Sequence, residues 1–456
     1  MSTSLKRSSA EAVGLSPASI HSFIDGVESS DLELHSLMIV RHGQVAVEGW
    51  WAPYRAEDIH LLYSLSKSFL SSAIGFAVQE GLIGLDDLVV DFFPDETPKD
   101  ASDNLKTMRV RHLLTMSTGH ETEPDRSKGW VRTFMEWPVP KKPGTHFLYN
   151  SMATFMLSAI LQKITGITAF DYLKPRLLEP LGIEGSTWEE TEEGITVGGW
   201  GMSIKTEDIA KFGQFYLQKG MWDGNRLLSE SWVEQASSKQ VDNSSNGNAD
   251  WKVGYGFQFW RCVPNCYRGD GAFGQYCVVI PEHDMVIAIT ASVDDMQVVL
   301  DFAWKYLMPS NSGGSQQELD ERLKALELKK PKGEYRPNIV GRTFEATEPT
   351  EFGKEVQFGF ESDGGFVRRD GRKVNFGFDE WVRTEEVPWW RGPGPFGAAA
   401  AWTAPDTLTI RMLHLKEPSK ITYEANFEGD NVTIKTTFGG MFIPAEGPTF
   451  KGKARS

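Results

Sequence analysis

The sequence predicts an α+β domain followed by an all-β domain. Strand-like apolar segments at both ends of the first 310 residues enclose a helix-rich middle. After residue 340, apolar and polar residues alternate with period two between glycine- and aspartate-rich turns. We therefore expect a first domain over residues 1–310, with a helical insert at about 81–245, a linker over 311–336 and a β-rich domain over 337–456. A chain of 456 residues is long enough for two such cores.

The beginning of the chain predicts a helix, a hairpin and a second helix. Ser16 and Pro17 form a plausible cap and first-turn pair for a helix over residues 16–27. Apolar segments at 37–40 and 45–50 flank a short polar connection that contains Gly43, which is a hairpin pattern. The next helix is expected from Ser64 to about Glu80, before Gly81.

The rest of the first domain predicts helices and then returning strands. The expected helices lie at 110–116, 152–165, 169–177, 206–219 and 294–307, and the expected strands at 253–260, 275–280 and 285–291. Strands from both ends of the domain are expected to form one antiparallel sheet covered by helices.

The linker and the C-terminal segment differ in character. Residues 319–330 form a short charged helix candidate within the linker. Beyond it, alternating segments such as 356–360, 374–378 and 408–412 are separated by turn sequences, which indicates a small barrel or sandwich.

Composition restricts the class of partner. The formal net charge is −15, which argues against nucleic-acid binding because phosphate contacts need clustered Lys and Arg. No apolar run reaches the length of a membrane span, and the N-terminus lacks the apolar region of a signal peptide, so we expect a cytoplasmic protein without membrane contact. Three cysteines do not make a disulfide framework, and Cys262 and Cys266 are interpreted as structural thiols rather than metal ligands.

Ser64 and Lys67 are the strongest chemical signal in the sequence. No other Ser in the chain has a Lys three residues after it. On a helix, positions i and i+3 share a face, so the hydroxyl and the amine can touch. A Ser beside a Lys that can lose its proton is an activated nucleophile, although the bland alternative is a helix start with a solvated Lys.

Two further features accompany this pair. Tyr149 stands at a loop-to-helix junction, where a Tyr serves packing or, near a Lys, acts as a general base. The glycine-rich segment 268–275 enters a strand; it is either an ordinary turn or a place where small residues let a substrate lie against the backbone. The Ala272 N–H could then complete an oxyanion hole with the Ser64 N–H.

Together these features resemble the serine β-lactamase and penicillin-binding-protein superfamily. The resemblance is closest to class C β-lactamases, D-aminopeptidases and related family VIII esterases and amide hydrolases, and it covers about residues 10–310. The matching landmarks, in the family's order, are 82–87, 93–94, 111–119, 198–203 and 206–210. The resemblance implies a β-lactamase-like domain whose antiparallel sheet is flanked by helices and carries an all-helical subdomain.

The resemblance also implies the role of each site residue. Ser64 matches the nucleophile that forms the acyl-enzyme, and Lys67 matches the residue that activates its hydroxyl. Tyr149 matches the residue that shares the base role and protonates the leaving group. A Lys useful as a base must titrate well below about 10.4, which burial and a nearby cation can achieve. No metal or organic cofactor is implied.

Two departures from the family's pattern bear on the substrate. Ser151 stands where the family has the Asn of Tyr-x-Asn, so a substrate amide contact is lost or altered. Gly269-Asp270-Gly271 stands where the family has Lys-Thr-Gly, so the cation that grips the carboxylate of a β-lactam is absent and Asp270 would repel an anion. Arg268 is adjacent, but a strand neighbour points to the opposite face. An uncharged ester or amide therefore fits better than a β-lactam.

Trp130 and Phe273 are the aromatic candidates for the substrate pocket, although most aromatic residues belong to the core. The loop 388–395 could reach the cleft as a lid or form a domain or subunit contact. The leading hypothesis is a serine hydrolase acting on a small ester or amide.

Four alternatives stay in view: an acyltransferase using the same acyl-enzyme, a β-lactamase, a non-catalytic binding protein, and a His-based triad through His112 or His146. No G-x-S-x-G sequence occurs, which excludes an α/β-hydrolase elbow. The oligomeric state, including a homo-oligomer, stays open.

Overall fold

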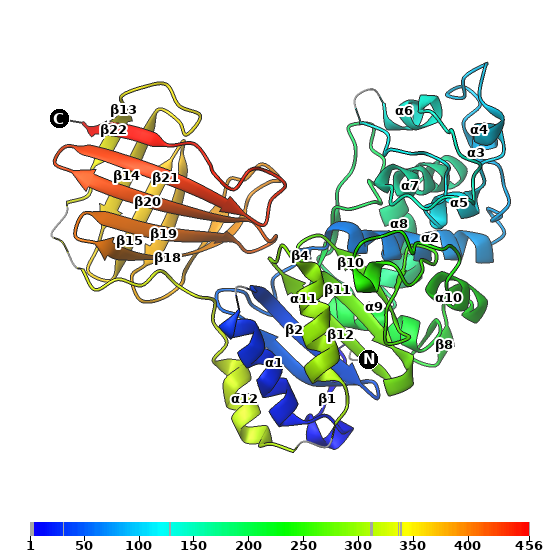
Figure 1. Ribbon diagram of the computed structural model, residues 1–456, viewed down its shortest axis with the longest axis horizontal. Helices are drawn as coiled ribbons and strands as arrows, with labels where there is room; N and C mark the ends of the chain where they lie inside the picture. Colours follow the sequence, from blue (N-terminus) through cyan, green and yellow to red (C-terminus); the bar gives the residue numbers. More distant parts are fainter. Residues whose placement is uncertain are drawn as a thin grey trace.

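The computed structural model describes residues 4–30, 32–126, 129–310, 313–335, 337 and 340–455. It has two lobes: a first domain of sheet and helices, and a separate C-terminal lobe made of strands (Figure 1). The predicted α+β class with a following all-β domain is confirmed.

The first domain is built on a seven-stranded sheet in the order β1-β3-β2-β12-β11-β10-β9. Apart from the parallel β1–β3 pair, neighbouring strands are antiparallel. Strands from both ends of the domain meet where β12 pairs with β2, as the sequence predicts. The strands are β1 (Lys6–Arg7), β2 (Leu34–Arg41), β3 (Gln44–Trp50), β9 (Trp260–Arg261), β10 (Tyr267–Gly271), β11 (Gln275–Ile280) and β12 (Met285–Ala291).

The two faces of this sheet belong to two apolar cores. Leu37 and Ile39 pack in a core shared with α1 (Pro17–Ser29), α11 (Met296–Phe302) and α12 (Gln316–Lys324). Met38 and Val40 face the other core, with α2 (Ser66–Gln79) and α9 (Thr206–Leu217). Alternate residues of a strand point to opposite faces, which explains why β2 is buried along almost its whole length.

The helical subdomain covers the end of the sheet at which Ser64 lies. Its helices are α3 (Val89–Phe92), α4 (Asp103–Lys106), α5 (Val110–Leu114), α6 (Trp130–Glu136), α7 (Ser151–Thr165), α8 (Ala169–Leu173) with the π-helical turn η3 (Lys174–Leu178), and α10 (Glu230–Ser237). Short strands β4 (His60–Leu61), β5 (Thr187–Trp188) and β6 (Met202–Ile204) form a second sheet, and β7 (Met221–Trp222) pairs with β8 (Asn225–Arg226). Within the described ranges no single helix is long and apolar enough to cross a membrane; α7 with the following helical segment meets that test only as a pair bent by 75°.

Two sequence predictions differ from the structure of this domain. The strand expected at 253–260 is wrong except at Trp260, because Gln258 has φ +65° and the segment forms turns. The expected charged helix begins earlier, as α12, and buries Leu319 against the first domain. The predicted linker 311–336 therefore contains a helix that packs on the first domain.

The C-terminal domain is a closed β-barrel. Nine strands follow one another in the order β16-β15-β14-β13-β22-β21-β20-β19-β18, and the β16–β18 pairing closes the ring, while β17 pairs with β18 outside it. The strands are β13 (Thr343–Ala346), β14 (Glu355–Phe360), β15 (Gly364–Arg369), β16 (Arg372–Gly377), β17 (Val382–Val387), β18 (Gly394–Ala404), β19 (Thr407–His414), β20 (Lys420–Glu428), β21 (Asn431–Gly439) and β22 (Phe450–Ala454).

Polar contacts join the barrel to the first domain. The Leu61 N–H donates to the Lys416 carbonyl at 2.7 Å, and Ser292 Oγ donates to the Pro418 carbonyl at 2.9 Å. Arg383 pairs with Asp58 at 2.9 Å, and both side chains are largely buried. These contacts fix the barrel beside β4, which leads directly to Ser64.

Candidate active site

Ser64 lies on a strained turn just before α2. It belongs to the 3-10 helix η2 (Tyr63–Leu65), and Tyr63 has φ +47°, a left-handed conformation that costs energy for a non-glycine residue. The end of β10 lies directly against this turn, since a Cβ at Gly271 would lie 1.9 Å from the Leu62 carbonyl oxygen and 3.1 Å from the Ser64 nitrogen. Only glycine permits this approach, which brings the backbone beside Ala272 to the Ser64 N–H.

Lys67 is buried on the first turn of α2, with its amine against three oxygen atoms. Lys67 Nζ lies 2.9 Å from Ser64 Oγ, 3.1 Å from Ser151 Oγ and 2.6 Å from the Gly199 carbonyl oxygen. A carbonyl only accepts, so one N–H must donate to Gly199. A neutral amine has one further N–H for Ser151 and one lone pair, which can accept the Ser64 proton.

Burial lowers the pKa of Lys67 to about 7. Desolvation is the largest cause, Arg126 adds to the lowering, and the carboxylates of Glu123 and Asp270 oppose it. Lys67 is only 1 % exposed, so its charge has little access to water. A substantial fraction of the amine is therefore neutral near pH 7, the form that can take a proton.

Tyr149 lies beside the same amine. Lys67 Nζ is 4.9 Å from the centroid of its ring, and the ring stacks on Trp260 at 5.2 Å. Burial raises the pKa of Tyr149 above its usual value, with a further rise from Asp270, while the hydrogen bond with the Ser64 side chain opposes this. Tyr149 therefore stays a phenol, which can donate a proton.

Asn150 and Ser151, which follow Tyr149, have different roles. Asn150 Oδ1 accepts from the N–H groups of Met152 and Ala153 and so caps α7. Ser151 begins the helix and turns its hydroxyl to Lys67. The side chain at the position of the family's Asn therefore holds the amine of Lys67.

Gly269 faces α2, and the space beside it is filled. A Cβ there would lie 2.4 Å from Leu65 Cδ1 and 2.5 Å from Ser68 Oγ. A lysine side chain cannot follow that path without moving both neighbours. The packing of Leu65 and Ser68 against Gly269 therefore leaves no room for the Lys that the family has at this position.

Arg268 and Asp270 lie on the opposite face of β10, paired with each other. Their Nη2 and Oδ2 atoms are 2.9 Å apart, Arg268 Nε also donates to Asp270, and both side chains are buried. The guanidinium of Arg268 lies over the Trp251 ring at 4.3 Å. The sequence interpretation of Asp270 as a free group that repels an anion needs correction, because its carboxylate is ion-paired with the buried guanidinium of Arg268.

The two aromatic candidates lie in different surroundings. Trp130 packs against Phe155 and Trp200 in the helical subdomain. Phe273 follows the end of β10 and contacts Tyr63 and Phe442, with ring centroids 5.5 Å and 4.9 Å away. Phe442 belongs to the barrel domain, so Phe273 connects the site to the second lobe.

Four residues of the site were not assigned a role there from the sequence. The Gly199 carbonyl makes the shortest contact with Lys67 Nζ. Glu123 raises the pKa of Lys67 and Arg126 lowers it. The Trp260 ring stacks on Tyr149. Gly199 lies inside a motif that the sequence already singles out. Glu123 and Arg126, paired at 3.1 Å, sit in a loop without a motif and become recognisable only in the fold.

Other candidate chemistries have less support. His112 accepts from the Arg109 N–H, His146 is exposed, and within the described ranges neither is hydrogen-bonded to Ser64. Cys262 and Cys266 are buried free thiols. Among the described residues no group of three or more His, Cys, Asp or Glu could hold a metal ion.

Residues 26–308 match the family model described as Beta-lactamase. The chain belongs to the β-lactamase family. It is therefore a hydrolase of the β-lactamase-related serine enzymes, and the matched range contains Ser64, Lys67 and Tyr149.

One relative and two solved structures illustrate the range of this family. The chain is 25 % identical over 286 residues to the 6-aminohexanoate-dimer hydrolase of Paenarthrobacter ureafaciens, covering 57 % of this chain and 73 % of the relative. It is similar in fold to EstCE1, a hydrolase with promiscuous acyltransferase activity, with TM-score 0.50, 17 % identity, and coverage of 60 % of this chain and 94 % of EstCE1.

The second solved structure covers nearly the whole chain. The octameric penicillin-binding protein homologue from Pyrococcus abyssi aligns with TM-score 0.52 and 17 % identity over 95 % of this chain and 99 % of its own. The alignment thus extends beyond the family domain into the residues of the barrel.

Proposed function

We propose that the protein hydrolyses an uncharged carboxylic ester or amide through an acyl-enzyme on Ser64. The observation that carries this proposal is the surrounding of Lys67. Its buried amine, with a pKa of about 7, has its N–H groups used by Gly199 and Ser151 and its lone pair left for Ser64.

Acylation follows from these contacts. Ser64 Oγ attacks the substrate carbonyl carbon as its proton passes to Lys67 Nζ. The carbonyl π pair moves to oxygen, where the N–H groups of Ser64 and Ala272 donate to it. The close approach of Gly271 to the Ser64 turn supports this pairing, because Ala272 directly follows Gly271.

Tyr149 completes the step as the acid. As the bond to the leaving alcohol or amine breaks, the phenol gives that group its proton, and Lys67 returns the Ser64 proton to Tyr149. Water then attacks the acyl-enzyme in the reverse sense, releasing the carboxylic acid and restoring the Ser64 hydroxyl. The raised pKa of Tyr149 supports the acid role, because a phenol that stays protonated can donate.

The preference for an uncharged substrate rests on β10. The place beside Gly269 is filled by Leu65 and Ser68, and the only cation on this strand, Arg268, is paired with Asp270 on the other face. No cation of β10 therefore faces a substrate carboxylate, which disfavours β-lactams and other anionic acyl donors.

The test compares p-nitrophenyl butyrate with nitrocefin. We expect turnover of the ester and little of the lactam, and we expect Ser64→Ala to abolish ester turnover. Ser72→Ala is the matched control, because Ser72 lies deeper in α2 and its hydroxyl bonds Ser68 and Tyr216 instead. Ester turnover by Ser64→Ala at the original rate would overturn the proposal. Adding a primary alcohol and measuring the new ester then separates hydrolysis from acyl transfer.

A further inference from the structure

The barrel domain encloses an apolar cavity of about 550 Å³ that opens at Tyr63, the residue before Ser64. A ring of more than eight strands is wider than its own side chains fill, which leaves room for a ligand. The volume lies within the range of small-molecule sites. Most of the wall is apolar or aromatic, including Val374, Phe396, Met412 and Ile421.

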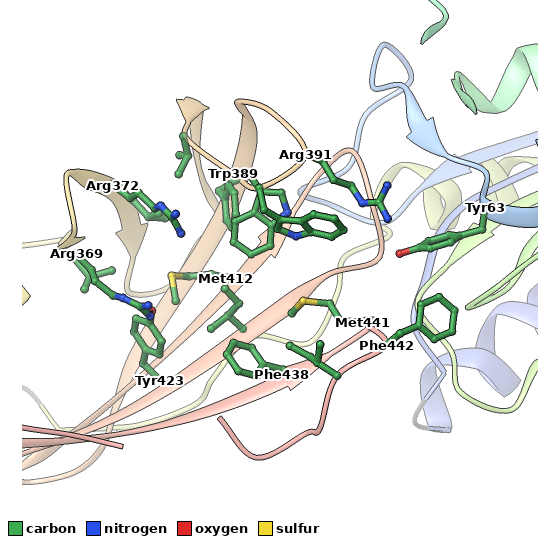
Figure 2. Close-up of a pocket in the computed structure, with 17 residues that line it drawn as sticks. Tyr63, Arg369, Arg372, Trp389, Arg391, Met412, Tyr423, Phe438, Met441 and Phe442 are labelled. Carbon is green, nitrogen blue, oxygen red and sulfur yellow. The ribbon is translucent and has the colours of Figure 1, made fainter. Parts of the chain in front are cut away.

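The cavity runs away from the active site into the barrel. Figure 2 shows Tyr63 at one end, with Phe442 and Arg391 beside it, and Arg369, Arg372 and Tyr423 at the other. Arg369 already bonds the Tyr423 hydroxyl at 3.2 Å and Asp370 at 3.3 Å. Between the two ends the cavity offers an apolar path.

Its opening is lined by exposed apolar side chains. Trp390, Phe442 and Ile443 are 64 %, 75 % and 50 % exposed, although all three line the cavity. Phe442 contacts both Tyr63 and Phe273, with ring centroids 5.8 Å and 4.9 Å away. Exposed apolar residues grouped at a cavity mouth mark a place where an apolar ligand enters. The loop 388–395, which contains Trp390, is held to the first domain by an ion pair between Arg391 and Glu189.

The geometry of β10 decides which part of the substrate lies there. Tyr149, which protonates the leaving group, stacks on Trp260, and Trp260 pairs with Arg268 at the start of β10. Ser64 lies opposite Gly271 at the end of β10, and Phe273 follows beyond it. The leaving group therefore extends toward Trp260, and the acyl group extends the other way, past Phe273 toward the barrel.

We propose that the barrel cavity binds the acyl chain of the substrate, so that the enzyme prefers esters or amides of long aliphatic acids. The proposal rests on the acyl-enzyme function above. Chain burial acts on ground state and transition state alike, so it raises kcat/KM chiefly through KM. Each methylene that enters the cavity is expected to raise kcat/KM by about two- to fourfold.

The test measures kcat/KM for p-nitrophenyl acetate, butyrate, octanoate and dodecanoate below their aggregation limits. Met441→Trp places bulk near the Tyr63 end and Met412→Trp places it farther along the cavity (Figure 2). We expect Met441→Trp to lower both the octanoate-to-acetate and the dodecanoate-to-acetate ratios by about tenfold or more, whereas Met412→Trp lowers chiefly the second. Val340→Trp, at a position 69 % exposed on the same domain, is the control and should leave the ratios unchanged.

A binding measurement separates this inference from the proposed function. Dodecanoic acid should bind the Ser64→Ala protein by calorimetry, and Met441→Trp should weaken that binding. The inference is overturned, and the proposed function stands, if p-nitrophenyl acetate is turned over through Ser64 but kcat/KM does not increase with acyl-chain length in any of the proteins. The same holds if dodecanoic acid binds while the ratios stay flat, since the cavity then holds a lipid that is not the substrate. If no ester acylates Ser64, both proposals fail.

Discussion

The candidate active site and the barrel cavity are built in opposite ways. In the active site three oxygen atoms surround the amine of Lys67, whereas the barrel encloses a cavity of about 550 Å³ between mostly apolar walls. In the first region, Lys67 Nζ contacts three polar groups: Ser64, Ser151 and Gly199. The second has space and few polar groups. Catalysis needs groups fixed within hydrogen-bond distance, while a binding site for an aliphatic acyl chain needs only a matching shape and the exclusion of water. The two regions meet at Tyr63, so one chain can supply both.

The largest expected effect separates chemistry from binding. Lys67→Met removes the base and should lower kcat/KM for p-nitrophenyl butyrate by roughly 10³-fold, within the range for general-base removal. Dodecanoic acid binding, measured by calorimetry, should stay within experimental error, because Lys67 does not line the cavity. A loss of both would mean that the two regions are not separate.

Tyr149→Phe should have a smaller effect that depends on the leaving group. Because the phenol protonates that group, kcat for an ethyl ester should fall by on the order of a hundredfold, and for a p-nitrophenyl ester by much less. The stacking on Trp260 needs no hydroxyl, so the substitution keeps the packing. Equal losses for both leaving groups would contradict the acid role.

The pH dependence gives the smallest expected effect. Lys67 works as the neutral amine, so kcat/KM should rise about tenfold per pH unit below its pKa of about 7 and level off above it. Arg126 lowers this pKa and Glu123 raises it. Arg126→Gln should therefore move the rising limb to higher pH and Glu123→Gln to lower pH, each by less than about one pH unit because both charges are partly exposed. Shifts of the opposite sign would show that Lys67 is not the group whose titration sets the pH profile.

The site was more predictable than the surroundings that tune it. Ser64, Lys67 and Tyr149 carry their chemistry in residue type and local spacing, so a sequence pattern suffices to propose them. Glu123, Arg126 and Trp260 act only because the fold brings separate loops together. Ser151 could be placed from its motif, but its hydrogen bond to Lys67 needed the structure.

The fold divides in the same way. Strands β11 and β12 are continuous apolar runs and were predicted at their observed bounds. Strand β10 contains two glycines and a buried Arg268–Asp270 pair, a composition that indicates a turn; pairing with β11 overrides it. In the barrel, the alternating pattern predicts strands but does not distinguish a filled interior from a hollow one, since both alternate inward apolar and outward polar residues.

The most direct test of the account is the site of covalent modification. A fluorophosphonate probe should add its mass to the peptide that contains Ser64, located by tandem mass spectrometry. Labelling should vanish in Ser64→Ala, persist in Ser72→Ala and slow in Lys67→Met. Labelling of another residue, or of Ser64→Ala at the original rate, would contradict the assignment of Ser64 as the nucleophile.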